Sequence, residues 1–224
     1  ISTQSETKCL HMLFLQNIML LRHLVMKENR RTCYLNSNDG SGILGFGDGP
    51  YLRLDDVNCF EDIEQFTTKY NNSYIFALFS YDLKNGIENL SSNNSDEIGF
   101  PAVILWCPEV VVRISNDQYE YVQGDEKDEH NDFISSILNE NTVADLKETV
   151  SFSPRTSKEK YLDTVNKLKE HIQKGDIYEV NYCQEYISYN TDIKDINNTY
   201  VNLNKITKAP FSCLFHFDEF AVFS

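Results

Sequence analysis

The chain has 224 residues, with 34 Asp and Glu against 20 Lys and Arg, which gives a formal net charge of −14 at pH 7. This acidic excess argues against a nucleic-acid binder or a basic membrane-surface protein, because both need Lys and Arg to meet phosphate groups. Hydrophobic residues make up 41% and charged residues 24%, so we expect a folded core in one large domain or in one and a half.

The first half of the chain alternates between helical and strand patterns. A helix is predicted over residues 7–28, where the apolar run is too short and too interrupted for a membrane span or a signal peptide. A second helix is predicted to begin at Asn58, because Glu61 three residues later gives the spacing of a capping box. Apolar and β-branched runs predict strands at residues 32–36, 43–46, 74–81 and 102–114.

Polar stretches separate these elements. Residues 85–97 are interpreted as an exposed loop. Residues 113–154 contain ten acidic and three basic residues around a short helical pattern at 133–138. We interpret this stretch as a solvated connector, with an acidic partner-binding tail as the alternative. Gly47 and Gly49 indicate a turn rather than a nucleotide loop, because no helix with phosphate-binding spacing follows them.

A clearer helical pattern follows Pro154. Thr156 and Glu159 have the spacing of a capping box, and Gly175 stands where a left-handed residue would end the helix. Between them, one helical face is apolar. Its residues are Tyr161, Val165, Leu168 and Ile172.

The last fifty residues predict strands around one more helix. Strict alternation predicts a long strand over residues 178–186, and a helix follows around 199–207. An apolar strand then leads through Asp218-Glu219, a two-residue turn, into a second apolar strand. Because a domain rarely stops in mid-hairpin with an apolar strand at an edge, we expect the printed chain to be a fragment.

These elements together predict an α+β fold with mixed, largely antiparallel sheets and packed helices. Six cysteines are present without a C-x-x-C pair, which favours buried free thiols in a reducing compartment, and we expect a cytoplasmic protein. The five histidines form no H-x-x-x-H pattern, so no metal site is predicted. The cysteines are Cys9, Cys33, Cys59, Cys107, Cys183 and Cys213.

Three blocks of the sequence resemble the opening of a chorismate-binding domain. They are Tyr161-Leu-x-x-Val-x-Lys-Leu-Lys-x-x-Ile172, Lys174-Gly-Asp-Ile-Tyr-Glu-Val-Asn-Tyr-Cys-Gln184 and Lys208-Ala-Pro-Phe-Ser-Cys-Leu-Phe215. That domain is shared by the large subunits of aminodeoxychorismate synthase and anthranilate synthase. Upstream, Cys33-Tyr-Leu-Asn-Ser37 and Trp106-Cys-Pro-Glu-Val110 resemble the N-terminal domain of the same family.

The resemblance implies two domains: residues 1–150 as the N-terminal domain and 151–224 as the incomplete beginning of the chorismate-binding domain. Ala209-Pro-Phe-Ser212 is similar to the aminodeoxychorismate branch, where Pro-Phe-Ser is usual. Tyr34-Leu-Asn-Ser37 also lacks the Glu that precedes the Ser in the anthranilate branch. The implied reaction is amination of chorismate to 4-amino-4-deoxychorismate, for para-aminobenzoate and folate synthesis. Mg²⁺ would assist it, and a glutamine amidotransferase subunit would supply ammonia.

No catalytic residue and no metal ligand is carried over, because the family's Ser-Pro-Glu and Pro-Ile-Lys-Gly-Thr motifs do not occur in the 224 residues. We therefore expect these residues to be inactive by themselves, with Mg²⁺ bound by a C-terminal half that the chain lacks. The alternatives are anthranilate synthase component I and a non-catalytic module that binds an amino acid or docks a partner.

The family's tryptophan pocket matches four residues of this chain: Ser37, Pro210, Phe211 and Ser212. A hydroxyl group and strand backbone can hold the polar end of an α-amino acid, while Pro and Phe can line a slot for an aromatic ring. In the alternative interpretation, Ser37 caps a turn and Phe211 belongs to the core. The segment Asn38-Asp-Gly-Ser-Gly42 departs from the aromatic-containing segment that is usual in the family.

Overall fold

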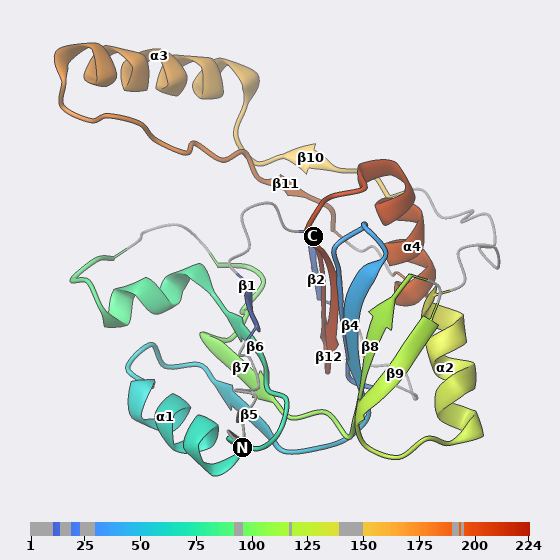
Figure 1. Cartoon of the computed structure of the whole chain (residues 1–224). Coiled ribbons are helices and arrows are strands. Elements are labelled where there is room, and N and C mark those ends of the chain that lie inside the picture. The colour runs from blue at the N-terminus through green and yellow to red at the C-terminus, as the bar shows by residue number, and fades with distance from the viewer. Residues whose placement is uncertain are drawn as a thin grey trace, which may run out of the picture. The chain divides into compact units, whose positions relative to one another are not determined.

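The computed structural model describes residues 11–13, 19–22, 30–91, 96–116, 118–138, 150–189, 193 and 195–224 (Figure 1). The chain divides into two compact units. The first combines Ile1–Ala144 with Lys194–Ser224, and the second is Asp145–Ile193. The division between residues 150 and 151 stays a prediction about the family's domains.

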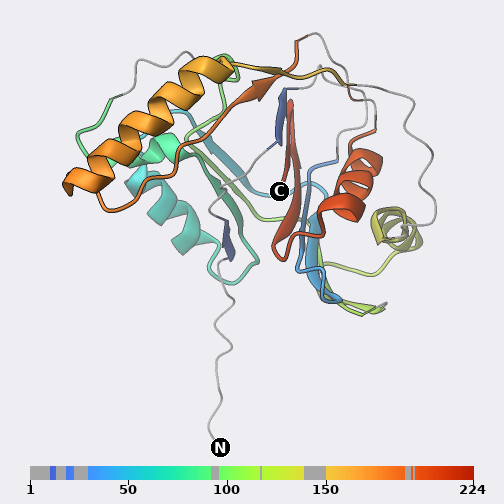
Figure 2. The same cartoon turned by 90° about the horizontal axis from the view of Figure 1, so that it is seen from above.

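The larger of two sheets in the first unit contains both early and late strands of the chain. Its strands are β2 (Met19–Arg22), β3 (Thr32–Asn36), β4 (Ser41–Phe46), β8 (Val110–Ser115), β9 (Gln118–Gln123), β12 (Ser212–Phe217) and β13 (Phe220–Phe223). Among the described residues they are ordered β2-β13-β12-β3-β4-β8-β9, and every neighbouring pair is antiparallel. The β12–β13 hairpin therefore lies between two N-terminal strands, β2 and β3, and Figure 2 shows its red strand beside blue N-terminal strands from above.

The smaller sheet of this unit carries the rest of the N-terminal strands. Its strands are β1 (His11–Leu13), β5 (Tyr51–Leu54), β6 (Phe76–Phe79) and β7 (Val103–Trp106). The order within the described residues is β1-β6-β7-β5, in which β1 is parallel to β6 and the other pairs are antiparallel. A short 3₁₀ helix, Tyr81–Gly86, follows β6. The predicted α+β fold with largely antiparallel sheets is confirmed.

The core of the first unit lies between the two sheets. Cys213, Phe215 and Phe217 alternate along β12 and are all buried. Phe76 and Trp106 from the smaller sheet belong to the same apolar cluster as Phe215 and Phe217. The Trp106 ring meets the Phe217 ring edge-on, with 4.8 Å between ring centroids. Burial of these large aromatic surfaces is a main source of the unit's stability.

Helices cover the outer faces of both sheets. Helix α1 (Phe60–Lys69) packs on the smaller sheet, where Ile63 and Phe66 border a cluster of buried β6 and β7 residues. Helices α2 (Asp128–Leu138) and α4 (Ile196–Thr207) pack on the larger sheet (Figure 1).

Ring contacts fix these two helices on the larger sheet. The Phe46 ring of β4 lies 4.8 Å from the Phe133 ring of α2. The Tyr34 ring of β3 lies 5.9 Å from the Tyr200 ring of α4.

The second unit is a helical arm on a two-stranded base. Helix α3 (Lys158–Lys174) is followed by an extended segment, and β10 (Ser153–Pro154) pairs antiparallel with β11 (Tyr186–Ile187). Beside this pairing, the Arg155 guanidinium approaches the Glu185 carboxylate to 2.7 Å. Gly175 ends α3 in the left-handed conformation, with a φ of 80°, as predicted.

Two predictions of long elements are wrong. Residues 11–13 and 19–22 are strands rather than parts of a helix, because they pair with β6 and β13, which lie far away in the sequence. The rest of the predicted helix lies outside the described residues. Of the predicted strand 178–186, only Tyr186 is in a strand, because β10 offers a partner of two residues and the preceding segment has no ladder partner among the described residues.

Other boundaries differ by less. Pro108 and its neighbours interrupt the run 102–114, which forms β7 and β8 instead of one strand. The 113–154 stretch is more than a connector, because it contains β9 and α2, and α2 buries His130, Ile134 and Ile137.

Neither predicted capping box forms. Helix α1 has Cys59 at its N-cap with no side-chain hydrogen bond, and α3 is capped by Ser157, whose hydroxyl accepts from the Lys160 amide. None of the helices in the described part of the chain is long and apolar enough to cross a membrane.

Candidate functional site

The four predicted ligand residues gather at one end of the β3–β12 ladder. Ser212, the first residue of β12, pairs with Asn36, the last residue of β3. Ser37 and Phe211 are therefore the first residues beyond the ladder on two neighbouring strands, and Pro210 precedes Phe211. The two halves of the predicted pocket, 173 residues apart between Ser37 and Pro210, are brought together by strand pairing.

The β3–β4 turn is ordered by its own side chains. The side-chain oxygen of Asn36 accepts a hydrogen bond from the backbone amide of Asn38 at 2.9 Å. The Asp39 carboxylate likewise accepts from the backbone amide of Ser41 at 2.8 Å. The Ser37 amide donates to the Ser41 carbonyl oxygen at 3.1 Å. Asn38 has a φ of 56°, a left-handed conformation that Asn tolerates better than most side chains.

A second turn joins α4 to β12 and meets the first one. Lys208, with a φ of 43°, ends α4 and donates its amide to the Asn204 carbonyl oxygen. The side-chain amides of Asn38 and Asn204 donate to each other's oxygens, at 2.9 and 2.8 Å. Asn38 also donates to the Ala209 carbonyl oxygen at 2.6 Å. The two turns are thus connected by three hydrogen bonds of the Asn38 side chain.

The Ser212 hydroxyl faces the protein interior. It lies 3.0 Å from the Tyr200 hydroxyl of α4, and Ser212 is only 2% exposed. Burial raises the pKa of Tyr200 to about 12, although hydrogen bonds to Ser212 and to the Asn36 side chain oppose that shift. The hydroxyl of Ser212 therefore serves the packing of α4 on the sheet.

The other predicted residues are more accessible. Phe211 is 78% exposed, Pro210 is exposed and Ser37 is half-buried. Phe211 is not ordinary core, which contradicts that part of the alternative interpretation. An exposed aromatic ring beside an ordered polar turn can provide a flat apolar surface and polar groups to a small ligand.

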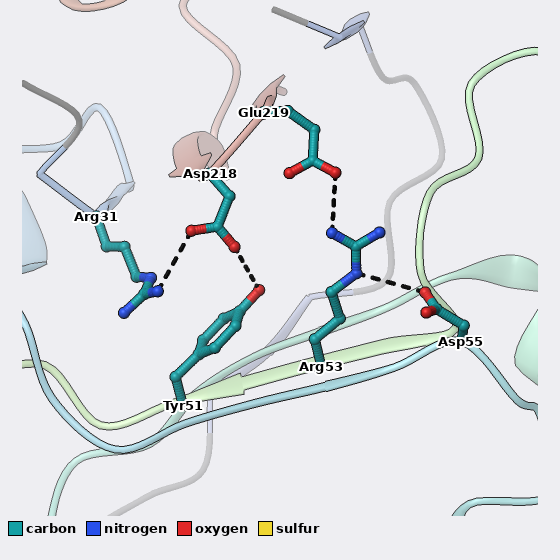
Figure 3. Close-up of polar contacts among 6 residues, drawn as sticks. All are labelled: Arg31, Tyr51, Arg53, Asp55, Asp218 and Glu219. Atoms are coloured by element: carbon teal, nitrogen blue, oxygen red, sulfur yellow. Dashed lines mark hydrogen bonds and ion pairs between the residues drawn. The ribbon is translucent and has the colours of Figure 1, made fainter. Parts of the chain in front are cut away.

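A separate polar cluster stabilises the opposite end of the β12–β13 hairpin (Figure 3). The Asp218 carboxylate of the hairpin turn accepts from Arg31 at 3.3 Å and from the Tyr51 hydroxyl at 3.0 Å. Next to it, Arg53 of β5 donates to Glu219 at 2.9 Å. Burial is the main cause that raises the pKa of Tyr51, and the negative charge of Asp218 is the second. The Tyr51 hydroxyl therefore keeps its proton and donates a hydrogen bond at neutral pH. These charges pair with one another and link the turn to β5 of the smaller sheet.

Comparison with protein families identifies a match over residues 21–224 to the chorismate binding enzymes. The chain belongs to this family. Among solved structures, the crystal structure of anthranilate synthase component I from Streptococcus pneumoniae TIGR4 is similar over 94% of this chain, with 12% sequence identity and a TM-score of 0.47. The chain spans 50% of the length of that protein. No curated protein matches the sequence.

The described residues do not fit the Mg²⁺ site that the resemblance implies. They contain no group of three or more His, Cys, Asp or Glu side chains suited to hold a metal ion. Cys33, Cys59, Cys107 and Cys213 are buried free thiols, as predicted, whereas Cys183 is exposed and Cys9 lies outside the described residues.

Sequence reasoning missed three polar residues of the site in this chorismate binding enzyme: Asn38, Tyr200 and Asn204. Asn38 carried a usable signal, because Asn-Asp-Gly between two strand patterns is typical of a turn with left-handed residues. Tyr200 and Asn204 lie four residues apart on one face of a helix. Their contacts depend on how α4 packs on the sheet, which the sequence pattern did not predict.

Proposed function

We propose that the protein acts on chorismate as the large subunit of an aminodeoxychorismate synthase, forming 4-amino-4-deoxychorismate for para-aminobenzoate and folate synthesis. The observation that carries this proposal is the family match over residues 21–224. The branch is supported by Ala209-Pro-Phe-Ser212 and by Asn36, which stands where the anthranilate branch has Glu. Anthranilate synthase component I is the alternative.

The proposed reaction displaces a ring hydroxyl of a dicarboxylate. It needs a group that helps the hydroxyl to leave, a cation that holds a carboxylate and a nucleophile at the ring. The family motifs that carry these roles are absent from the 224 residues, so we expect these residues to be inactive by themselves. Mg²⁺ would bind residues outside this chain, and a glutamine amidotransferase subunit would supply the ammonia.

The 224 residues have a second proposed role, which is to bind an aromatic α-amino acid such as tryptophan at Ser37, Pro210, Phe211 and Ser212. The register of Ser212 with Asn36 supports it, since it puts the two segments side by side. The exposure of Phe211 supports it too, because a ring that is 78% exposed is accessible for stacking on a ligand. In this role, the hydroxyl of Ser37 and strand backbone groups would hold the polar end of the ligand.

Growth tests distinguish the two enzymatic candidates. The gene that encodes these residues, in its full length, is expressed in bacteria that lack their own large subunit of one or the other synthase, with ammonium supplied. Growth without para-aminobenzoate supports the proposed function. Growth without tryptophan alone supports the anthranilate alternative. The 224 residues expressed by themselves are the control, and we expect no growth from them in either strain.

The amino-acid role is tested by titrating the protein with L-tryptophan in a calorimeter. We expect the unmodified protein to bind L-tryptophan and the Phe211→Ala variant to lose most of that affinity. Ile206→Ala is a matched control, because Ile206 is another exposed apolar residue, 84% exposed, in the same region of the chain. Equal affinity of Phe211→Ala and the unmodified protein would contradict the assignment of Phe211.

A further inference from the structure

The strongest unassigned feature of the first unit is the amide pair of Asn38 and Asn204. Neither residue belongs to the predicted ligand set, yet each satisfies the other's amide in both directions, at 2.9 and 2.8 Å. Asn204 is 7% exposed, so its amide group depends on this pairing for its hydrogen bonds. The pair joins residues 166 positions apart in the sequence.

The pair lies between the two segments that carry the candidate ligand residues. Ser37 directly precedes Asn38 in the β3–β4 turn. On the other side, the side-chain amide of Asn38 also donates to the carbonyl oxygen of Ala209, the residue before Pro210. A displacement of Asn38 would therefore change the distance between the Ser37 turn and the Pro210–Phe211 turn.

The ladder by itself does not fix that distance. The β3–β12 pairing ends at Asn36 and Ser212, so three of the ligand residues, Ser37, Pro210 and Phe211, lie beyond the last paired residues. Within the β3–β4 turn, the Ser37 amide bonds across the turn, to the carbonyl oxygen of Ser41. Asn38 carries the described side-chain bonds from this turn to the α4–β12 connection.

We propose that Asn38 and Asn204 are positioning residues whose reciprocal amide hydrogen bonds hold the Ser37 turn and the Pro210–Phe211 turn at the spacing that an aromatic α-amino acid requires. This inference rests on the amino-acid role proposed above. It assigns the pair no contact with the ligand. A site that is held in its binding geometry before the ligand arrives loses less conformational freedom on binding, so its affinity is higher.

The test is a double-mutant cycle on the affinity for L-tryptophan, measured by calorimetry. Asn38→Gly removes one amide and keeps the left-handed turn, because Gly adopts a positive φ freely. Asn204→Ala removes the other amide. Asn202→Ala is the matched control, since Asn202 lies on the same helix and its amide bonds within that helix, to Asn198 at 3.2 Å.

We expect each of the two variants to raise Kd by about tenfold, as the loss of positioning hydrogen bonds predicts. The double variant should raise Kd no further than the weaker-binding single variant, because the pair acts as one unit. Asn202→Ala should leave Kd unchanged. Thermal midpoints are measured alongside, and titrations are run at a temperature at which every variant is folded.

The outcomes separate the inference from the role on which it rests. If the unmodified protein does not bind L-tryptophan, the amino-acid role is refuted and the positioning role falls with it. If the unmodified protein binds and both variants bind equally well, only the positioning role is refuted, and a fall in their thermal midpoints then shows a structural pair. If Asn204→Ala does not fold, Asn38→Gly in the exposed turn still decides between these results.

Discussion

Removing the Tyr200 hydroxyl tests whether Ser212 serves the fold rather than a ligand. Both residues are 2% exposed, and their hydroxyl oxygens lie 3.0 Å apart. Tyr200→Phe leaves the Ser212 hydroxyl buried without its partner, which costs about 1–3 kcal/mol of the free energy of unfolding. Ser212→Ala leaves Tyr200 its bond to the Asn36 side chain, so we expect the smaller loss of about 0.5–1.5 kcal/mol.

The double variant gives the sharper result. In Tyr200→Phe/Ser212→Ala no unpaired serine hydroxyl remains, so the double variant should be no less stable than Tyr200→Phe alone. Urea denaturation followed by circular dichroism measures all three free energies. Tyr119→Phe is a matched control with a loss near zero, because Tyr121 also donates to the Asn131 oxygen that Tyr119 bonds. Additive losses, or a larger loss in Ser212→Ala than in Tyr200→Phe, would refute this reasoning.

Three further results are expected. Gly49→Ala should destabilise the protein by about 1–3 kcal/mol in urea denaturation, because a β-carbon there would collide with the Cys107 carbonyl oxygen; unchanged stability would show that this close approach is absent. Burial raises the pKa of Tyr200 to about 12 from 10.0 and that of Cys213 to about 12 from 9.0, so the folded state keeps protons that the unfolded state releases. The stability that these groups provide is complete below pH 9.0 and is lost as the pH rises toward 12, so the urea midpoint should fall over that range, and less steeply in Tyr200→Phe. Asp218→Ala should cost about 1–2 kcal/mol by removing the acceptor of both Arg31 and Tyr51, and Asp218→Asn should cost less because it keeps an acceptor for Tyr51; equal losses would contradict the hydrogen bond to Tyr51.

The sequence predicted elements whose hydrophobic pattern and local chemistry agree. Residues 32–36 form β3 as predicted, and Asp218-Glu219 is the two-residue turn between β12 and β13. Helix α3 ends at Gly175 because the left-handed conformation favours Gly there. In each case the signal lies within a few neighbouring residues.

Predictions failed where pairing partners lie far away in the sequence. Residues 19–22 form β2 because β13, some 200 residues later, offers a ladder, and no local pattern contains that information. Conversely, the alternating run 178–186 has the pattern of a strand and lacks a ladder partner over most of its length. Asn58 is not the N-cap of α1, because its amide is taken up by Asp56, and the helix begins two residues later.

The candidate site also combines residues that the sequence indicates with contacts that depend on distant parts of the chain. The resemblance implies Ser37, Pro210 and Phe211 as ligand residues, and strand pairing brings them together. The burial of the Ser212 hydroxyl and the pairing of Asn38 with Asn204 depend on where α4 packs, so only the structure shows them.

The most direct test of the proposed activity is the product formed from chorismate. The full-length protein is incubated with chorismate, ammonium and Mg²⁺, with the 224 residues by themselves assayed in parallel, and the products are separated and identified by mass spectrometry and fluorescence. We predict 4-amino-4-deoxychorismate from the full-length protein and no product from the 224 residues. Anthranilate would contradict the proposed branch, and turnover by the 224 residues would contradict the assignment of the chemistry to residues outside this chain.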